Sequence, residues 1–233
     1  MKSLAVMQPY FFPYIGYFQL INAADLFIVY DNIKYTKKGW INRNRFLQNG
    51  KDVVFSIPLR KDSDFLDIRD REISIDFKKA KLLNQIREAY RRSPYFERTF
   101  SLVERIVLEK ETNLFKFVLN SIGETCKCLA IGTEIAVSSS LQIDHSLQSK
   151  TKVVALCKQV GADVYINAIG GQDLYSKDDF SRHGIDLKFL KTKSFEYKQL
   201  GDKFVPWLSI IDVMMFNSPE LIRECLDSNY ELI

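Results

Sequence analysis

The first thirty residues of the chain contain two apolar runs with a helical pattern between them, and this order constrains the fold. The runs are SLAVM at residues 3–7 and LFIVY at residues 26–30. Residues 14–24 carry apolar side chains near helical spacing. A strand, a helix and a strand in so few residues form a βαβ unit, which implies a parallel sheet with a right-handed crossover. The second run is continuously apolar, as is typical of a strand buried on both faces.

The rest of the chain continues this alternation, except for one helical block. Three helices without an intervening strand are predicted at residues 77–92, 94–109 and 112–129. Further strands are predicted at 53–57, 72–75, 134–137, 163–167 and 187–190, and further helices at 150–160, 208–216 and 219–226. No internal repeat or low-complexity linker separates them. We therefore expect a single α/β domain over residues 1–233, with a mostly parallel sheet flanked by helices and a helical insertion at residues 77–130.

Composition narrows the class of protein. A net charge of +4 over 233 residues suits phosphorylated small ligands but is too small to indicate duplex DNA binding, so nucleic acid is not the expected partner. The four cysteines and two histidines lack the paired spacing of a zinc site, so we expect no metal. The amino-terminal apolar run is too short for a signal peptide, and no stretch approaches membrane-spanning length. We expect a cytoplasmic protein with reduced thiols and no membrane insertion.

Three polar loops follow predicted strands, and ligands of open α/β sheets bind beyond the carboxyl ends of the strands. QPYFFP follows the first strand, DNIKY the second, and AIGGQD the strand at 163–167. The two prolines fix a strand-to-helix turn, which would place Gln8 and Tyr10 at the edge of the sheet. Gly170 and Gly171 would either let a ligand approach the backbone or only form a turn.

The stretch after the second strand is the richest in candidate groups. Asp31 directly follows that strand and is the candidate general base, with Gln8 as an orienting group. WINRNR, at residues 40–45, then offers a ring, amides and guanidinium groups. Arginine pairs bidentately with phosphate or carboxylate, and tryptophan stacks on a sugar or a base. The predicted substrate-binding residues here are Lys34, Trp40, Asn42, Arg43 and Asn44. The alternative is an exposed hairpin whose charges serve solubility.

Three long segments resemble the WbqC-like protein family: MQPYFFPYIGYFQLINAADLFIVYDNIKYTKKGWINRNRF, GADVYINAIGGQDLYSKDDFSRHGIDLKF and FVPWLSIIDVMMFNSPE. The resemblance implies a bacterial transferase of O-antigen and lipopolysaccharide biosynthesis, which adds an aminoacyl (glycyl) or acyl group to an amino sugar of a nucleotide-activated sugar. It also implies that Ser209 and Asp212 support the site. The chain departs from the family at Met7, where a histidine is expected; an acid/base role of that histidine would be missing here.

Other functions stay open from the sequence. A nucleotidyl- or glycosyltransferase could use the same pocket, and a looser similarity to HUP-type nucleotidylyltransferases is compatible with this at the level of the fold. A non-catalytic protein could instead bind nucleotides or nucleic acid through residues 34–45. The expected partner is a small-molecule substrate, a nucleotide sugar. The sequence identifies no cofactor and no acyl donor, and it leaves homo-oligomer formation open.

Overall fold

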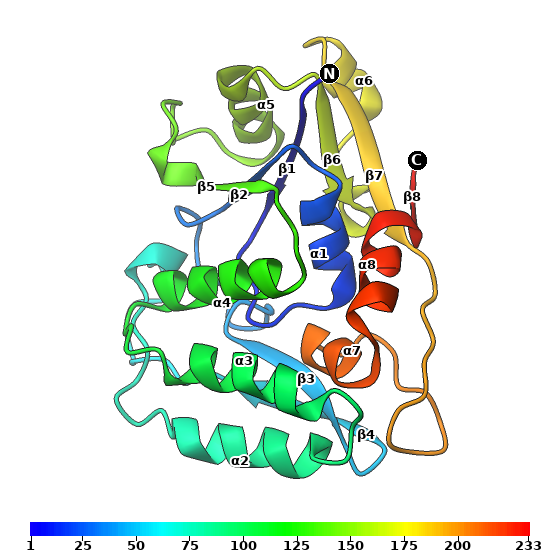
Figure 1. Ribbon diagram of the computed structural model, residues 1–233. Coiled ribbons are helices and arrows are strands. Elements are labelled where there is room, and N and C mark those ends of the chain that lie inside the picture. Colours follow the sequence, from blue (N-terminus) through cyan, green and yellow to red (C-terminus); the bar gives the residue numbers. More distant parts are fainter.

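A six-stranded sheet forms the centre of the protein in the computed structural model, which describes residues 1–233 (Figure 1). Its strands lie in the order β5-β2-β1-β6-β7-β8. All neighbouring strands pair in parallel except β7 and β8. The predicted α/β fold with a mostly parallel sheet is therefore confirmed. The strands are β1 (Ser3–Met7), β2 (Leu26–Val29), β5 (Glu134–Val137), β6 (Val164–Ala168), β7 (Asp186–Thr192) and β8 (Tyr230–Leu232).

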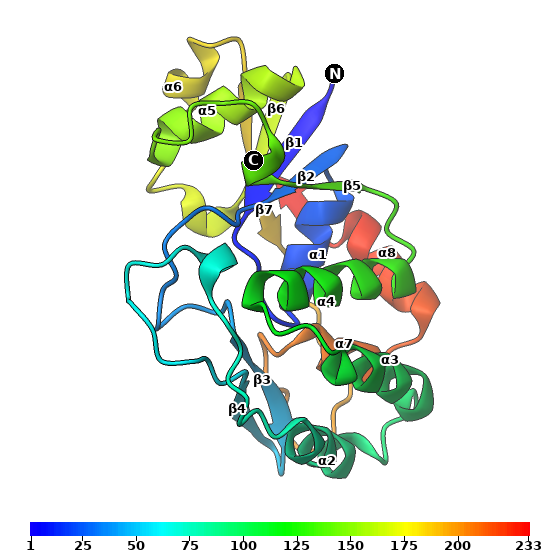
Figure 2. The same ribbon diagram turned by 90° about the vertical axis from the view of Figure 1, so that its left-hand side faces the viewer.

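Helices cover both faces of this sheet. One face packs against α1 (Ile15–Asn22) and α8 (Pro219–Ser228), and the other against α5 (Ser149–Val160) and α6 (Lys177–Ser181) (Figure 2). Successive side chains of a strand point to opposite faces. In β1, Ala5 accordingly belongs to the apolar cluster around α1, whereas Leu4 and Val6 belong to the cluster around α5. A central strand covered on both sides must be apolar at every position, which explains the run SLAVM.

The segment between β2 and β5 forms a second layer of structure, in the lower half of Figure 1. It contains the antiparallel hairpin of β3 (Arg43–Gln48) and β4 (Lys51–Ser56), followed by α2 (Lys79–Tyr90), α3 (Phe96–Leu108) and α4 (Leu114–Cys128). Helix α7 (Ile210–Phe216) returns to pack against this layer. A core of 47 buried residues runs through these elements to one face of the main sheet. Short 3₁₀ turns complete the fold: η1 (Ile68–Asp70), η2 (Ser138–Ser140) and η3 (Ile169–Gly171).

The predicted strand at 72–75 is wrong. Residues 72 and 73 form only isolated bridges, Glu72 with Asn113 and Leu59 with Ile73. The chain there runs alongside two loops in turn, so no ladder of consecutive hydrogen bonds develops. The strand predicted at 53–57 corresponds to β4, whereas its partner β3 was not predicted. No helix of the protein has both the length and the apolar character that crossing a membrane requires.

The turn between β1 and α1 is fixed by side chains from distant segments. Phe12 has a positive φ of 44°, which a residue with a side chain adopts only under strain. The Asn44 amide Nδ2 donates to the carbonyl oxygens of Phe11 and Phe12 at 3.1 and 2.8 Å. The Ser209 hydroxyl donates to the Phe12 carbonyl at 2.8 Å. Hairpin strand β3 and the amino terminus of α7 therefore hold this turn in its strained conformation.

A buried carboxylate joins α7 to the same layer. Asp212 is fully buried and accepts hydrogen bonds from the hydroxyls of Tyr90 and Tyr197 and from Nε2 of Gln199, each at 2.7 Å. Burial raises the pKa of this carboxyl, and the three hydrogen bonds act in the opposite direction. Tyr90 also accepts a hydrogen bond from the Leu47 amide at 2.8 Å. Asp212 thus links α7, α2 and β3.

We expect Asn44→Asp to destabilise the protein by about 2–4 kcal/mol, because a carboxylate would replace the amide donor and face two carbonyl oxygens in a buried site. The measurement is the free energy of unfolding in urea. Asn49→Asp is the matched control, since Asn49 is exposed at the tip of the same hairpin. Equal stability of the two variants would show that Asn44 does not hold the turn.

Candidate functional site

A large cleft opens where the direction of the sheet connections reverses. Counted in chain order, the six strands of the sheet are arranged 3-2-1-4-5-6, the order of doubly wound nucleotide-binding sheets. Ligands of such sheets bind in the crevice between strands 1 and 4, here β1 and β6. The cleft has a volume of ≈ 1200 Å³ and is lined by residues that follow both strands, including Gln8 and Gly170. These strand ends can be followed in Figure 2.

Tyrosines line both walls of this cleft. On the α1 side lie Tyr10 and Tyr17, whose rings are 5.7 Å apart. On the α5 side lie Tyr30, Tyr165 and Tyr175, and the last two rings meet edge-to-face at 5.9 Å. Burial raises the pKa of the Tyr10 and Tyr175 hydroxyls, so these groups stay protonated at neutral pH. Aromatic walls of this kind suit a flat or ring-shaped ligand.

Asn32 organises the polar groups at the end of β2. Its amide Nδ2 donates to Nδ1 of His145 at 2.8 Å, and Nε2 of the same ring donates to the Leu141 carbonyl at 3.0 Å. Both ring nitrogens of His145 are therefore engaged by protein groups. The Lys152 ammonium donates to the Asn32 carbonyl and to its Oδ1, both at 3.2 Å. Asn32, His145 and Lys152 all line the cleft.

Five residues of the predicted site line the cleft, but the predicted base does not. The five are Gln8, Tyr10, Lys34, Gly170 and Gly171, and Met7 lies beside them. Asp31 is buried next to the cleft and is absent from its lining. Its carboxylate accepts hydrogen bonds from the Ser138 hydroxyl at 2.8 Å and from the Ser139 amide and hydroxyl at 2.9 and 2.5 Å. These contacts tie the end of β2 to the turn after β5.

The structure brings none of the other predicted residues to the cleft lining: Trp40, Asn42, Arg43, Asn44, Ser209 and Asp212. The Arg43 guanidinium donates to the carbonyls of Gly39 and Lys38. Asn42 donates to the Ile57 carbonyl at 2.8 Å and accepts from the Tyr35 hydroxyl at 2.9 Å. Trp40 lies on the surface against Arg43 and Arg45. The remaining three hold the contacts of the core described above.

Several polar residues of the cleft were not predicted from the sequence, and Lys152 and Asn167 are the most deeply buried of them. Lys152 lies on the buried side of α5 with Val153 and Leu156. Its spacing of four residues from Leu156 places both on one face of the helix, and this spacing was the available sign in the sequence that Lys152 is buried. Asn167 is the last residue but one of the buried strand β6. Its Oδ1 accepts a hydrogen bond from the Ala168 amide, and its Nδ2 donates to no protein group. The two residues are 5% and 6% exposed.

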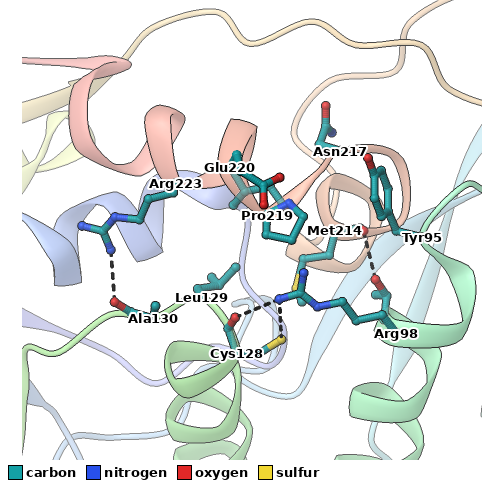
Figure 3. A pocket seen from close by; sticks show the side chains of 12 residues that line it. Tyr95, Arg98, Cys128, Leu129, Ala130, Met214, Asn217, Pro219, Glu220 and Arg223 are labelled. Atoms are coloured by element: carbon teal, nitrogen blue, oxygen red, sulfur yellow. Dashed lines mark hydrogen bonds between the residues drawn. The ribbon is translucent and has the colours of Figure 1, made fainter.

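A second, smaller pocket of ≈ 300 Å³ lies between α3, α4, α7 and α8 (Figure 3). Its two arginines donate to carbonyls at the carboxyl end of α4, Arg98 to Cys128 and Arg223 to Ala130. Cations at this end of a helix satisfy its last carbonyls. The two arginines of this pocket therefore bind the end of α4, and we take the larger cleft at the sheet edge as the candidate functional site.

The structure contains no group of three or more histidine, cysteine, aspartate or glutamate side chains that could hold a metal ion. All four cysteines are free. Burial raises the pKa of the Cys126 and Cys157 thiols to about 12, so both stay protonated.

We expect Gly171→Ala to displace the Asn167 amide from the cleft, because a Cβ at Gly171 would lie 2.1 Å from Asn167 Nδ2. Gly170→Ala is the matched control, since a Cβ there meets nothing within 4 Å. The side-chain amide signals of Asn167 in NMR spectra should move in the first variant only, with a stability loss of about 1 kcal/mol or less. An unmoved amide in Gly171→Ala would contradict this geometry.

Comparison with known proteins shows the family of the chain. A family model described as the WbqC-like protein family matches residues 8–224. The chain is also 30% identical over 234 residues to the uncharacterized protein Rv1507c of Mycobacterium tuberculosis (strain ATCC 25618 / H37Rv), with 97% of this chain and 99% of the relative covered. No solved structure matches the chain significantly. The matched region contains β2, β5, β6, β7, the whole layer between β2 and β5, and every cleft residue after Met7. The chain accordingly belongs to the WbqC-like protein family.

Proposed function

We propose that this protein is a transferase of surface-polysaccharide biosynthesis that acts on a nucleotide-activated amino sugar and adds an aminoacyl (glycyl) or acyl group to the sugar's amine. The observation that carries the proposal is the cleft at the switch point of a doubly wound sheet, the place where such sheets bind nucleotides. Its volume of ≈ 1200 Å³ leaves room for a nucleotide and a sugar together.

The lining of the cleft suits the parts of such a ligand. The partly exposed rings of Tyr10, Tyr30 and Tyr175 offer surfaces on both walls for a base or a pyranose ring. Gly170, with open space where a side chain would begin, allows the ligand to approach the backbone. Lys34 adds a positive charge to the lining, next to the ring of Phe65 at 4.4 Å. Together these features favour an anionic ligand that contains rings.

The proposed reaction requires a proton acceptor. The sugar amine attacks the acyl carbonyl, a C–N bond forms, the bond to the donor's leaving group breaks, and the nitrogen loses a proton. Asp67 is the one carboxylate among the residues that line the cleft. We assign proton acceptance to Asp67 in place of Asp31, whose carboxylate is occupied by Ser138 and Ser139. The bridge between Lys34 and Asp67 places the two residues side by side.

The alternative functions have less support. Nucleic-acid binding through residues 34–45 has fewer free cations than the sequence offers, because Lys37 pairs with Asp64 and Arg45 with Asp52, which leaves Lys34 and Lys38 without an ion pair. The Arg43 guanidinium is directed to backbone carbonyls. A nucleotidyl- or glycosyltransferase would use the same cleft, and release of free nucleotide during turnover would distinguish it from an acyltransferase.

We expect nucleotide-linked amino sugars to raise the melting temperature of the protein, since a ligand at 100 times its dissociation constant adds about 2.7 kcal/mol of stability. Incubation with acyl donors should then convert the sugar amine to an amide, which mass spectrometry detects. The proposal fails if no nucleotide sugar stabilises the protein at millimolar concentration.

Tyr10→Leu should weaken binding of the nucleotide sugar by about 5- to 150-fold, because stacking of a ring on an aromatic side chain contributes about 1–3 kcal/mol. Tyr10→Phe keeps the ring and should bind within about threefold of the original protein. Tyr95→Leu is the control, since Tyr95 lines the pocket of Figure 3 instead of the cleft. Calorimetric titration of the three variants provides the test, and equal weakening by Tyr10→Leu and Tyr95→Leu would place the ligand elsewhere.

A further inference from the structure

Lys152 is a buried cation that has no carboxylate partner. Its side chain belongs to a residue that is 5% exposed, and none of the ion pairs in the structure includes it. The ammonium contacts two neutral oxygens of Asn32 and lies 5.6 Å from the centre of the Tyr30 ring. Burying a charge without a counter-ion is unfavourable for folding. A group kept in this state points to a partner that comes from outside the chain.

The surrounding charges do not neutralise Lys152. Burial lowers the pKa of its ammonium, and nearby Arg69 acts in the same direction. Asp67 and Asp31 act in the opposite direction without reaching ion-pair distance. Lys152 is also the fourth residue of α5, so the positive end of the helix dipole adds to its own charge.

The amino terminus of α5 faces the same cleft and lacks a side-chain cap. Residues 146–149 line the cleft, Gln148 makes no capping hydrogen bond, and the first turn contains no acidic residue. The first amides of a helix have no partner within the helix and bind anions readily. An independent donor lies in the same cleft: Asn167 is 6% exposed as a residue, and its Nδ2 group donates to no protein group.

We propose that Lys152, the first turn of α5 and the Asn167 amide form a phosphoryl-binding subsite of the cleft. In the proposed function this subsite would hold the diphosphate of the nucleotide sugar. The inference rests on the proposed function only for which molecule carries the phosphoryl groups. An anion is favoured because donors from α5 and from the end of β6 line the same cleft, while Asp67 is the one acid of the lining.

The experiment is calorimetric titration of the protein and of Lys152→Met with inorganic pyrophosphate, uridine diphosphate and uridine. Pyrophosphate and uridine diphosphate should bind Lys152→Met about 10- to 150-fold more weakly, as expected for the loss of charge-assisted hydrogen bonds. Uridine, which carries no phosphate, should bind both proteins alike. Lys158→Met is the matched control, because Lys158 is exposed on the same helix and its loss changes the net charge equally.

Thermal melting of the ligand-free variants separates a binding role from a structural one. Replacing a buried unpaired charge by an apolar side chain of similar size should leave the melting temperature unchanged or raise it. A lower melting temperature together with unchanged pyrophosphate affinity would show that Lys152 only holds Asn32, and would overturn the proposal. Absence of pyrophosphate binding to the unaltered protein at millimolar concentration would overturn it as well.

The same titrations keep this inference distinct from the proposed function. If pyrophosphate binds in a Lys152-dependent manner but no nucleotide sugar stabilises the protein, the subsite stands and the proposed function fails. If a nucleotide sugar binds and Lys152→Met binds both it and pyrophosphate equally well, the function stands and the subsite fails.

Discussion

The strained turn at Phe12 is the contact on which the rest of the structure depends. Its carbonyl accepts hydrogen bonds from Asn44 on the hairpin and from Ser209 at the start of α7, two segments far apart in the chain. A positive φ at a residue with a side chain persists only when surrounding contacts enforce it. The same contacts therefore determine how the chain leaves β1 and enters α1. Because Gln8 and Tyr10 immediately precede this turn, the folding of the inserted layer also fixes one wall of the cleft.

The sequence predicted those parts of the fold that depend on local pattern. The βαβ unit, the three helices between β4 and β5, and strands β5, β6 and β7 are runs whose pattern is visible in the sequence alone, whereas the short antiparallel strand β8 was not predicted. Strand β3 was missed because its buried positions, Asn44, Phe46 and Leu47, neither alternate nor form an apolar run. Residues 72–75 have the composition of a strand, yet no neighbouring segment runs beside them long enough to form a ladder. Pairing partners are set by tertiary contacts, which a local pattern does not contain.

The candidate site was predicted by position more reliably than by side-chain chemistry. Residues at the ends of strands β1 and β6, such as Gln8 and Gly170, line the cleft because the sheet topology brings strand ends together. The dense donor cluster at residues 40–45 does not line the cleft, because its donors are used within the fold. Arg43 donates to the carbonyls of a neighbouring turn, and Asn44 donates to those of Phe11 and Phe12. A sequence shows which donors exist, but the backbone carbonyls that accept from them, in a nearby turn for Arg43 and in a distant segment for Asn44, are brought into place only by the fold.

Two buried charges illustrate how the chain separates stability from binding. Asp212 is fully buried, and three donors from Tyr90, Tyr197 and Gln199 satisfy its carboxylate, so this charge joins elements of the core. Lys152 is almost as deeply buried, but only neutral oxygens of Asn32 face its ammonium. A fold selected for stability alone would pair or replace such a lysine, because an apolar side chain of similar volume is often at least as stable there. Unlike Asp212, Lys152 lines the cleft, where an anionic ligand can reach its ammonium, so this position is open to a partner from solution and the core position of Asp212 is not.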